Sequence, residues 1–347
     1  MVTAVRNLKE TIVPFTATDG FECNLLHVEG PAPPTKGPVM LVHGAGVRAN
    51  IFRAPVDQTL VDMLVDSGYD VWLENWRASI DFAPNQWTLD QAAIHDHPQA
   101  VNKIMEQAGA DSIQAVIHCQ GSTSFMMGIA AGLMPGVRTV VSNAVSLHPV
   151  IPRLSSFKMA SLIRLVGSQY PYMNPQWGLD ADTWQAKLVS LWVGLTHHEC
   201  DNAVCKQASF TYGIGFPTLW EHDQLNEATH DWLTHEFAEV PRSFFQQMNR
   251  SVAEGALVSV ESDPRLPASF AEYTPQTDAR FAFLAGELNR CFLPESQQRT
   301  YEMFDAMRPN YHSVHVLPGY AHLDVFMGKN AAQDVFPIIL DELDKPV

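Results

Sequence analysis

The feature that most constrains the fold is a short apolar run that ends abruptly in polar and small residues. Residues 113–117 (IQAVI) are typical of a buried β-strand, residues 118–122 (HCQGS) interrupt it, and residues 125–133 are apolar with helical spacing. A strand that turns this sharply into a helix lifts one side chain clear of the sheet and needs small neighbours. The pattern therefore places Cys119 at the apex of the turn, with Gly121 where a small residue is required.

Strand-like and helix-like segments alternate on both sides of this turn, which indicates an α/β fold with a mostly parallel sheet. An Asp19-Gly20 dipeptide predicts a hairpin within residues 10–29. The other expected strands are 39–42, 69–73, 113–117, 137–141, 280–284 and 313–317. The expected helices are 55–67, 88–107, 125–133, 297–307 and 331–343, the last capped by Asn330.

The alternation stops between residues 150 and 278, where Trp and Met are frequent and helical periods dominate. We therefore expect one core built from residues 1–149 and 279–347, with residues 150–278 inserted as a helical cap or lid. The Trp-, Met- and Phe-rich insertion is expected to form a small core of its own. Part of it is expected to line an apolar acyl pocket, since ligand sites favour the junction of two layers.

Composition excludes several classes of protein. Of 347 residues 46% are hydrophobic and 17% are charged, so the chain has the apolar surface that a disordered protein lacks. The formal charge of -16 repels phosphate backbones and anionic lipid surfaces, so we expect no nucleic-acid partner. No apolar stretch approaches the roughly 18 to 20 residues of a membrane span, so we expect no stable membrane insertion. The oligomeric state is not determined by these features.

Cysteine usage bears on the cellular compartment. The five cysteines are odd in number and widely scattered, which fits a reducing environment better than a disulfide framework. The first 15 residues contain no continuous apolar segment of the kind that a secretory signal needs. The sequence therefore predicts a cytoplasmic protein.

The proposed position of Cys119 suggests a nucleophile. Amides at the start of the following helix are expected to point at its sulfur and to lower the pKa of the thiol, which would make thiolate available near neutral pH. The alternative is that Cys119 is one more buried, inert thiol. Two further motifs, at the chain positions that such a catalytic site requires, favour the nucleophile.

The first motif is His43-Gly44-Ala45-Gly46, directly after a buried strand. Its glycines let the backbone bend so that the amide of Ala45 points toward the apex, where the amide of Gln120 would be a second donor. Two such donors form an oxyanion hole, with each donor stabilising the transition state by roughly 3 to 4 kcal/mol.

The second motif, residues 317–324 (LPGYAHLD), follows the last expected strand and contains His322. A histidine in this loop can reach the apex of the central strand, accept the thiol proton and return it to a leaving group. The chain contains 14 histidines, so it is the position of His322 that distinguishes it.

Together these motifs resemble the α/β-hydrolase family, and within it the lipase-like branch. The resemblance implies the α/β-hydrolase fold and the chain order nucleophile, acid, histidine. The chain is also similar to the hydrolase modules associated with bacterial sterol-oxidase-like flavoproteins, which implies a lipophilic substrate. The motifs that carry the resemblance span nearly the whole chain: 43–46 (HGAG), 75–77 (NWR), the helix with Asp96 and Pro98, 118–122 (HCQGS) and 319–324 (GYAHLD).

The first departure from the family pattern is at the turn itself. The family sequence G-x-S-x-G is replaced by residues 117–121 (IHCQG), with cysteine for serine and Ile117 at the first small position. Moving the register to Ser122 places Gln120 at that small position and Ser122 inside the helix. Cys119 therefore stays the expected nucleophile, while Ile117 puts the geometry of the turn in question.

The second departure concerns the acid, which the family places just after the strand that follows the insertion. In residues 286–294 (GELNRCFLP), Asn289 occupies the usual position and Glu287 is the nearest carboxylate. Either residue can orient His322, and the sequence leaves both open. Asp324 is a third candidate, but it lies only two residues from His322 and is better explained as a residue that fixes the loop.

A cysteine nucleophile also bears on the reaction. Thiolate leaves a tetrahedral intermediate more readily than alkoxide, so thioesters, activated esters and strained lactones are favoured over simple alkyl esters. We expect hydrolysis of a lipophilic ester, thioester or lactone through a thioester acyl-enzyme, with no cofactor. The alternative is acyl transfer to an alcohol or amine. The polyhydroxyalkanoate synthases are a precedent, because they are similar in carrying a cysteine at this strand-to-helix turn. A further alternative is a catalytically silent ligand-binding homologue.

A second group of potential ligands lies in the expected cap. His197, His198, Cys200 and Cys205 have donor types that bind zinc, but their spacing matches no common structural zinc pattern. We therefore expect no metal at this set. A local disulfide between Cys200 and Cys205 is an alternative to two unpaired thiols.

Overall fold

The central feature of the fold is an eight-stranded sheet with the strand order β1-β2-β4-β3-β5-β6-β9-β10. The computed structural model describes residues 8–156, 158, 171–213 and 218–346. The strands of this sheet are β1 (Lys9–Thr16), β2 (Glu22–Glu29), β3 (Pro38–Val42), β4 (Asp70–Asn75), β5 (Ile113–His118), β6 (Val137–Asn143), β9 (Arg280–Gly286) and β10 (Ser313–Leu317).

The sheet is parallel from β4 to β10, while β1 and β2 form an antiparallel hairpin that pairs with β4. Every residue of β3, β4, β5 and β9 is buried, as expected for strands that are covered on both faces. β5 lies between β3 and β6, with Ile117 opposite Val42 on one side and Ser142 on the other. The mostly parallel α/β fold expected from the sequence is thus confirmed.

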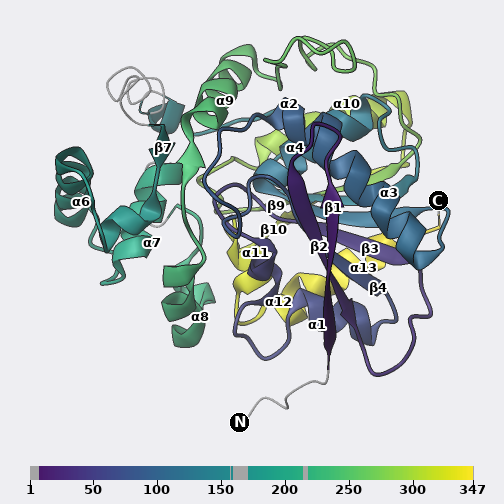
Figure 1. The fold of residues 1–347 in the computed structure, drawn as a ribbon, viewed down its shortest axis with the longest axis horizontal. Helices are drawn as coiled ribbons and strands as arrows, with labels where there is room; N and C mark the ends of the chain where they lie inside the picture. Colours follow the sequence, from purple (N-terminus) through teal and green to yellow (C-terminus); the bar gives the residue numbers. More distant parts are fainter. Residues whose placement is uncertain (1–7, 157, 159–170, 214–217, 347) are drawn as a thin grey trace.

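Helices cover both faces of the sheet (Figure 1). α3, α4 and α10 lie on one face, and α1 and α13 lie on the other together with α12. The remaining short helical segments of this part of the chain are α2, α11, η1 and η2. The bounds of these elements are η1 (Ala49–Arg53), α1 (Leu60–Asp66), α2 (Leu89–Gln91), the π-helical η2 (Ala92–Asp96), α3 (His97–Ala108), α4 (Cys119–Ala130), α10 (Glu295–Met307), α11 (Asp324–Met327), α12 (Ala331–Asp334) and α13 (Phe336–Asp344).

Between β6 and β9 the regular structure of the described residues is mostly helical, and helices α6 to α9 lie to one side of the sheet (Figure 1). A boundary of this region at residues 150 and 278 stays a prediction. Within the described residues, no helix is both long and apolar enough to cross a bilayer. The elements of this region are β7 (Tyr172–Met173), η4 (Pro175–Gly178), α6 (Trp184–Thr196), α7 (Ala203–Tyr212), η5 (His222–Gln224), α8 (Glu227–Trp232), η6 (Leu233–His235), β8 (Val240–Pro241) and α9 (Arg242–Glu254).

The C-terminal helix differs from the sequence prediction. Instead of one helix over residues 331–343, α12 ends at Asp334 and α13 begins at Phe336. Pro337 has no N–H to donate to the carbonyl four residues earlier, so a continuous helix is broken before it. Asn330 is the N-cap residue of α12, as expected, but its side chain makes no capping hydrogen bond.

Candidate functional site

The turn after β5 raises Cys119 above the edge of the sheet. β5 ends at His118, α4 begins at Cys119, and the φ angle of Cys119 is +55°, a left-handed value that non-glycine residues rarely adopt. A side chain at Gly121 would collide with the His43 carbonyl oxygen, which explains why this position needs glycine. Ile117 is fully buried within β5, and the sharp turn forms despite its size.

Three hydrogen-bond donors surround the sulfur of Cys119. They are the backbone amides of Gln120 and Ala45 and the side chain of Gln120, whose Oε1 accepts from the Thr123 hydroxyl at 3.0 Å. Burial nevertheless raises the pKa of the thiol to about 12, and these donors offset the rise only in part. The expectation of a lowered thiol pKa is therefore wrong for the free protein, because desolvation outweighs the helix amides.

Residues 43–46 form a tight loop against the sulfur. A Cβ at Gly44 would lie 2.9 Å from the Cβ of Cys119, so only glycine lets the loop approach this closely. The Ala45 carbonyl accepts a hydrogen bond from the Tyr212 hydroxyl at 2.9 Å, and the His43 carbonyl accepts one from Trp76 Nε1 at 2.9 Å. These two bonds fix the loop and aim the Ala45 amide.

The His43 ring helps to fix this loop. Its Nδ1 donates to the Gly44 carbonyl at 2.7 Å, and complete burial lowers its pKa to about 3. The Gly46 φ angle is +65°, and its carbonyl accepts from the Ala238 amide at 3.1 Å.

His322 reaches the sulfur from the loop after β10. One of its ring nitrogens, the Cys119 sulfur and a ring nitrogen of His118 all lie within 4.8 Å of one another. His322 is 1% exposed, and burial lowers its pKa to about 3, so the ring is neutral at physiological pH. The backbone amide of His322 donates to the Leu219 carbonyl at 3.2 Å, which anchors the loop to the helical region.

Asn289 contacts His322 with its amide nitrogen. Its Oδ1 accepts hydrogen bonds from the backbone amides of Cys291 and Phe292 at 3.0 and 3.1 Å. Because these two donors must face an oxygen, the NH₂ group is the one that lies 3.1 Å from Nδ1 of His322. Nδ1 is therefore an acceptor, and the neutral ring carries its proton on Nε2, the nitrogen left for the thiol.

The other two candidates for this role lie elsewhere. Glu287 accepts a hydrogen bond from the Gly319 amide at 3.2 Å. Asp324 accepts from the backbone amides of Ala321 and Glu221 at 2.8 and 2.9 Å, and burial raises its pKa to about 7. These bonds fix the loop that carries His322, which agrees with the interpretation of Asp324 as a loop-fixing residue.

His118 was not singled out from the sequence, although it lies against both Cys119 and His322. Its ring centroid is 4.6 Å from that of His322, and its Nδ1 accepts from the side-chain amide of Asn143 at 2.9 Å. Burial lowers its pKa well below the usual value, so it too is neutral. Only its position next to the apex in residues 118–122 pointed to it.

The structure does not assemble the four potential ligands that the sequence placed side by side. His197 packs against Trp192 and Phe210, and His198 Nε2 bonds to the Leu195 carbonyl at 2.8 Å. Cys200 and Cys205 instead lie beside two other histidines, His222 and His230, which the spacing of the sequence does not indicate. All five cysteines are free thiols, so the Cys200–Cys205 disulfide is not formed.

Comparisons with known proteins agree with the fold and find esterases and lipases among the proteins that this chain resembles. No family model matches the chain. It is 27% identical over 131 residues to sterol esterase 2 of Saccharomyces cerevisiae, covering 33% of this chain and 24% of that one. It is 32% identical over 124 residues to gastric triacylglycerol lipase of Rattus norvegicus, covering 32% and 31%. The matches thus span about a quarter to a third of these relatives.

Among solved structures, a thermophilic esterase from Thermogutta terrifontis superposes with a TM-score of 0.52 and 15% identity, covering 96% of this chain and 98% of that one. A likeness at this identity shows the fold. The chain therefore has the α/β-hydrolase fold and resembles the lipases and esterases built on it.

Proposed function

We propose that this chain catalyses acyl transfer from a lipophilic ester, thioester or lactone, with Cys119 as the nucleophile and water as the usual acceptor. The observation that carries the proposal is the geometry at the sulfur. Cys119 stands at a left-handed turn between β5 and α4, with the amides of Ala45 and Gln120 directed at its sulfur and His322 beside it. The relatives named as esterase and lipase support ester chemistry.

The proposed reaction begins with attack of the Cys119 sulfur on the carbonyl carbon while the thiol proton passes to Nε2 of His322. The carbonyl π electrons move to oxygen, and the amides of Ala45 and Gln120 stabilise that oxyanion. On collapse, the carbon–leaving-group bond breaks, and the leaving group takes the proton from His322. Water then attacks the thioester with His322 as base, which releases the acid and restores the thiol.

Asn289 makes the first proton transfer difficult. Nε2 can accept a proton only in the tautomer that carries hydrogen on Nδ1, and that hydrogen would face the NH₂ group of Asn289. Turning the amide over would cost the two backbone hydrogen bonds to its oxygen, at about 1 kcal/mol or more each. We infer that the enzyme favours acyl donors with good leaving groups, for which a weak base suffices.

Mass spectrometry of the intact protein tests this proposal. After incubation with a panel of acyl thioesters, activated esters and lactones of different chain lengths, we expect at least one member to leave an acyl adduct on Cys119. Cys119→Ala should abolish the adduct, whereas Cys23→Ala, a buried thiol in β2, should retain it. No adduct with any member of the panel would contradict the proposal.

The acceptor is tested in the same reaction. If the enzyme is a hydrolase, free acid forms and added alcohols or amines leave the product ratio unchanged. If it is an acyltransferase, the acceptor diverts product away from free acid in proportion to its concentration. In that case an alcohol or amine is the acyl acceptor in place of water, and the proposed roles of Cys119 and His322 stay the same.

A second candidate function is a catalytically silent ligand-binding protein. The observation that favours it is the protonated resting state, since burial raises the thiol pKa to about 12 and Asn289 blocks the base. Native mass spectrometry distinguishes the two functions. A retained lipophilic molecule that never becomes covalent would indicate binding alone, and a covalent adduct on Cys119 would exclude it.

A further inference from the structure

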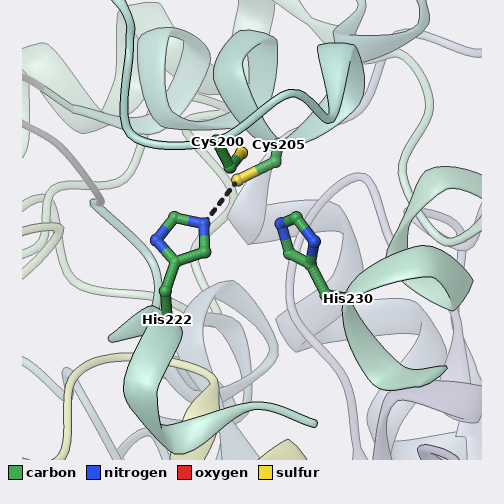
Figure 2. Close-up of side chains that lie close together, drawn as sticks. All are labelled: Cys200, Cys205, His222 and His230. Atoms are coloured by element: carbon green, nitrogen blue, oxygen red, sulfur yellow. Dashed lines mark hydrogen bonds between the residues drawn. The ribbon is translucent and has the colours of Figure 1, made fainter. Parts of the chain in front are cut away.

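Two cysteines and two histidines of the helical region point toward one another (Figure 2). One ligand atom from each of Cys200, Cys205, His222 and His230 lies within 4.8 Å of the other three. Cys205 Sγ is 3.4 Å from Nε2 of His222. Sulfur and nitrogen ligands on tetrahedral zinc are about 3.5 Å apart, given Zn–S of roughly 2.3 Å and Zn–N of roughly 2.0 Å.

The four side chains come from separate elements that hydrogen bonds already hold together. Cys205 lies in the first turn of α7, whose cap residue Asn202 accepts from the Cys205 amide at 3.0 Å. The Asn202 NH₂ group donates to the His230 carbonyl at 3.0 Å and to the Thr234 hydroxyl at 2.9 Å. Asn202 thus fixes the backbones of two of the ligands relative to each other without a metal.

Several polar atoms around this cluster are buried without a hydrogen-bond partner in the part of the chain that the structure describes. They are Nε2 of His230 and both carboxylate oxygens of Glu199, the residue before Cys200. Leaving such atoms unpaired is costly, so their presence calls for a partner. A divalent cation at the cluster would take a lone pair from His230 and would place positive charge close to Glu199.

We propose that Cys200, Cys205, His222 and His230 form a Cys₂His₂ site for Zn²⁺. The donor set is the one that structural zinc sites use, and the four ligands fill a tetrahedral shell and leave no position open for substrate. Binding would release the two thiol protons to solvent, so that two thiolates balance the charge of the ion. The spacing C-x₄-C-x₁₆-H-x₇-H has no regular pattern because the ligands come from a loop, a helix, a short turn and a second helix.

The proposed metal would brace the loop that carries His322. His222 begins η5, directly after the segment in which the Leu219 carbonyl accepts from the amides of His322 and Leu323 at 3.2 and 2.7 Å. The Glu221 amide donates to Asp324 at 2.9 Å. At the other end of α7, the Tyr212 hydroxyl bonds to the Ala45 carbonyl. Zinc would therefore join the two segments that position the loops on either side of Cys119.

Metal analysis of the purified protein tests this site directly. After expression with zinc and exhaustive dialysis, we expect about one Zn²⁺ per chain by inductively coupled plasma mass spectrometry. In competition with a chromogenic chelator, zinc binding should be weakened by at least about tenfold in each of four variants. They are Cys200→Ser, Cys205→Ser, His222→Ala and His230→Ala. Substitution with Co²⁺ should give a thiolate-to-cobalt charge-transfer band that both serine variants lose.

Two matched variants and the wild-type protein make the result decisive. His198→Ala removes a histidine two residues from Cys200, and Cys119→Ala removes the thiol of the other Cys–His cluster; both should retain the metal. Three results would each overturn the proposal. They are loss of the metal in Cys119→Ala, a Cys200–Cys205 disulfide in peptide maps, and wild-type protein that takes up no zinc on titration. Because no readout depends on turnover, failure of the proposed acyl chemistry leaves this test unaffected.

Discussion

The described part of the chain contains two clusters in which cysteine sulfur lies close to histidine nitrogen, and the two are built in different ways. Around Cys119, backbone and side-chain amides donate to a single sulfur, and the two histidines are neutral and held by asparagines. Around Cys200 and Cys205, two sulfurs meet two imidazoles, and no asparagine side chain bonds their ring nitrogens among the described contacts. The first arrangement suits attack on a carbonyl, and the second suits the binding of a cation.

The comparison shows that residue types alone do not assign chemistry to a cluster. What distinguishes the two is the direction of the surrounding hydrogen bonds. Donors aimed at the Cys119 sulfur can stabilise an oxyanion beside it, whereas lone pairs from four side chains that converge on one point need a positive charge there. Changing one hydrogen-bond donor of the Cys119 cluster to an acceptor should therefore alter that cluster and leave the cluster of Cys200 and Cys205 unchanged.

The largest effect is expected from Asn289→Asp. A carboxylate would accept the Nδ1 hydrogen of His322 and stabilise the imidazolium, which frees Nε2 to take the thiol proton. We predict that alkylation of Cys119 near neutral pH and acylation by the panel both rise roughly 10- to 1000-fold. Asn310→Asp, which adds a charge at a distant surface turn, should leave both rates unchanged. An unchanged rate in Asn289→Asp, or a rate that falls in Glu287→Gln, would contradict the assignment of Asn289.

The second largest effect is expected in the pH dependence of Cys119 alkylation. Burial raises the pKa of the Cys119 thiol to about 12, so the thiolate fraction is small at neutral pH and grows as pH rises. We predict that the rate increases about tenfold per pH unit from roughly pH 7 to pH 10, where an ordinary thiol has already reached its plateau. Peptide mapping with iodoacetamide measures the rate at each cysteine. A plateau at Cys119 below about pH 8 would show instead that a thiolate is stabilised in the free protein.

A smaller effect is expected at the loop that carries Ala45. Tyr212→Phe removes the hydroxyl that donates to the Ala45 carbonyl and so loosens the amide that faces the oxyanion. One such hydrogen bond is worth about 1 kcal/mol, so we predict a fall of about fivefold in the rate constant for acylation. Tyr311→Phe removes a hydroxyl that donates to the Asp278 carbonyl, away from Cys119, and should leave the rate constant for acylation unchanged. Equal rates in the two variants would show that Tyr212 has no positioning role.

Much of the core could be predicted because parallel strands are buried on both faces and appear as continuous apolar runs. Their carboxyl ends meet at one edge of the sheet, so the loops with Ala45, Cys119 and His322 had to converge there. The helix break before Pro337 was missed because the apolar periodicity of residues 331–343 continues across it.

The charge state of the site could not be predicted from the sequence. The helix amides do donate to Cys119, but whether they lower its pKa depends on how completely the sulfur is buried. The direction of the Asn289 amide depends on two backbone donors that only the folded loop supplies. The zinc ligands were missed because His222 and His230 are separated from Cys205 by chain segments of irregular length.

The most direct test of the central claim is the tautomer of His322, measured by ¹⁵N-detected nuclear magnetic resonance with Asn289→Asp as the comparison. Because burial lowers the pKa of the ring to about 3 and Asn289 donates to Nδ1, we predict a neutral ring with its proton on Nε2 from about pH 5 to pH 8. In Asn289→Asp the proton should appear on Nδ1. A wild-type ring with its proton on Nδ1, or a charged ring in this range, would contradict the claim.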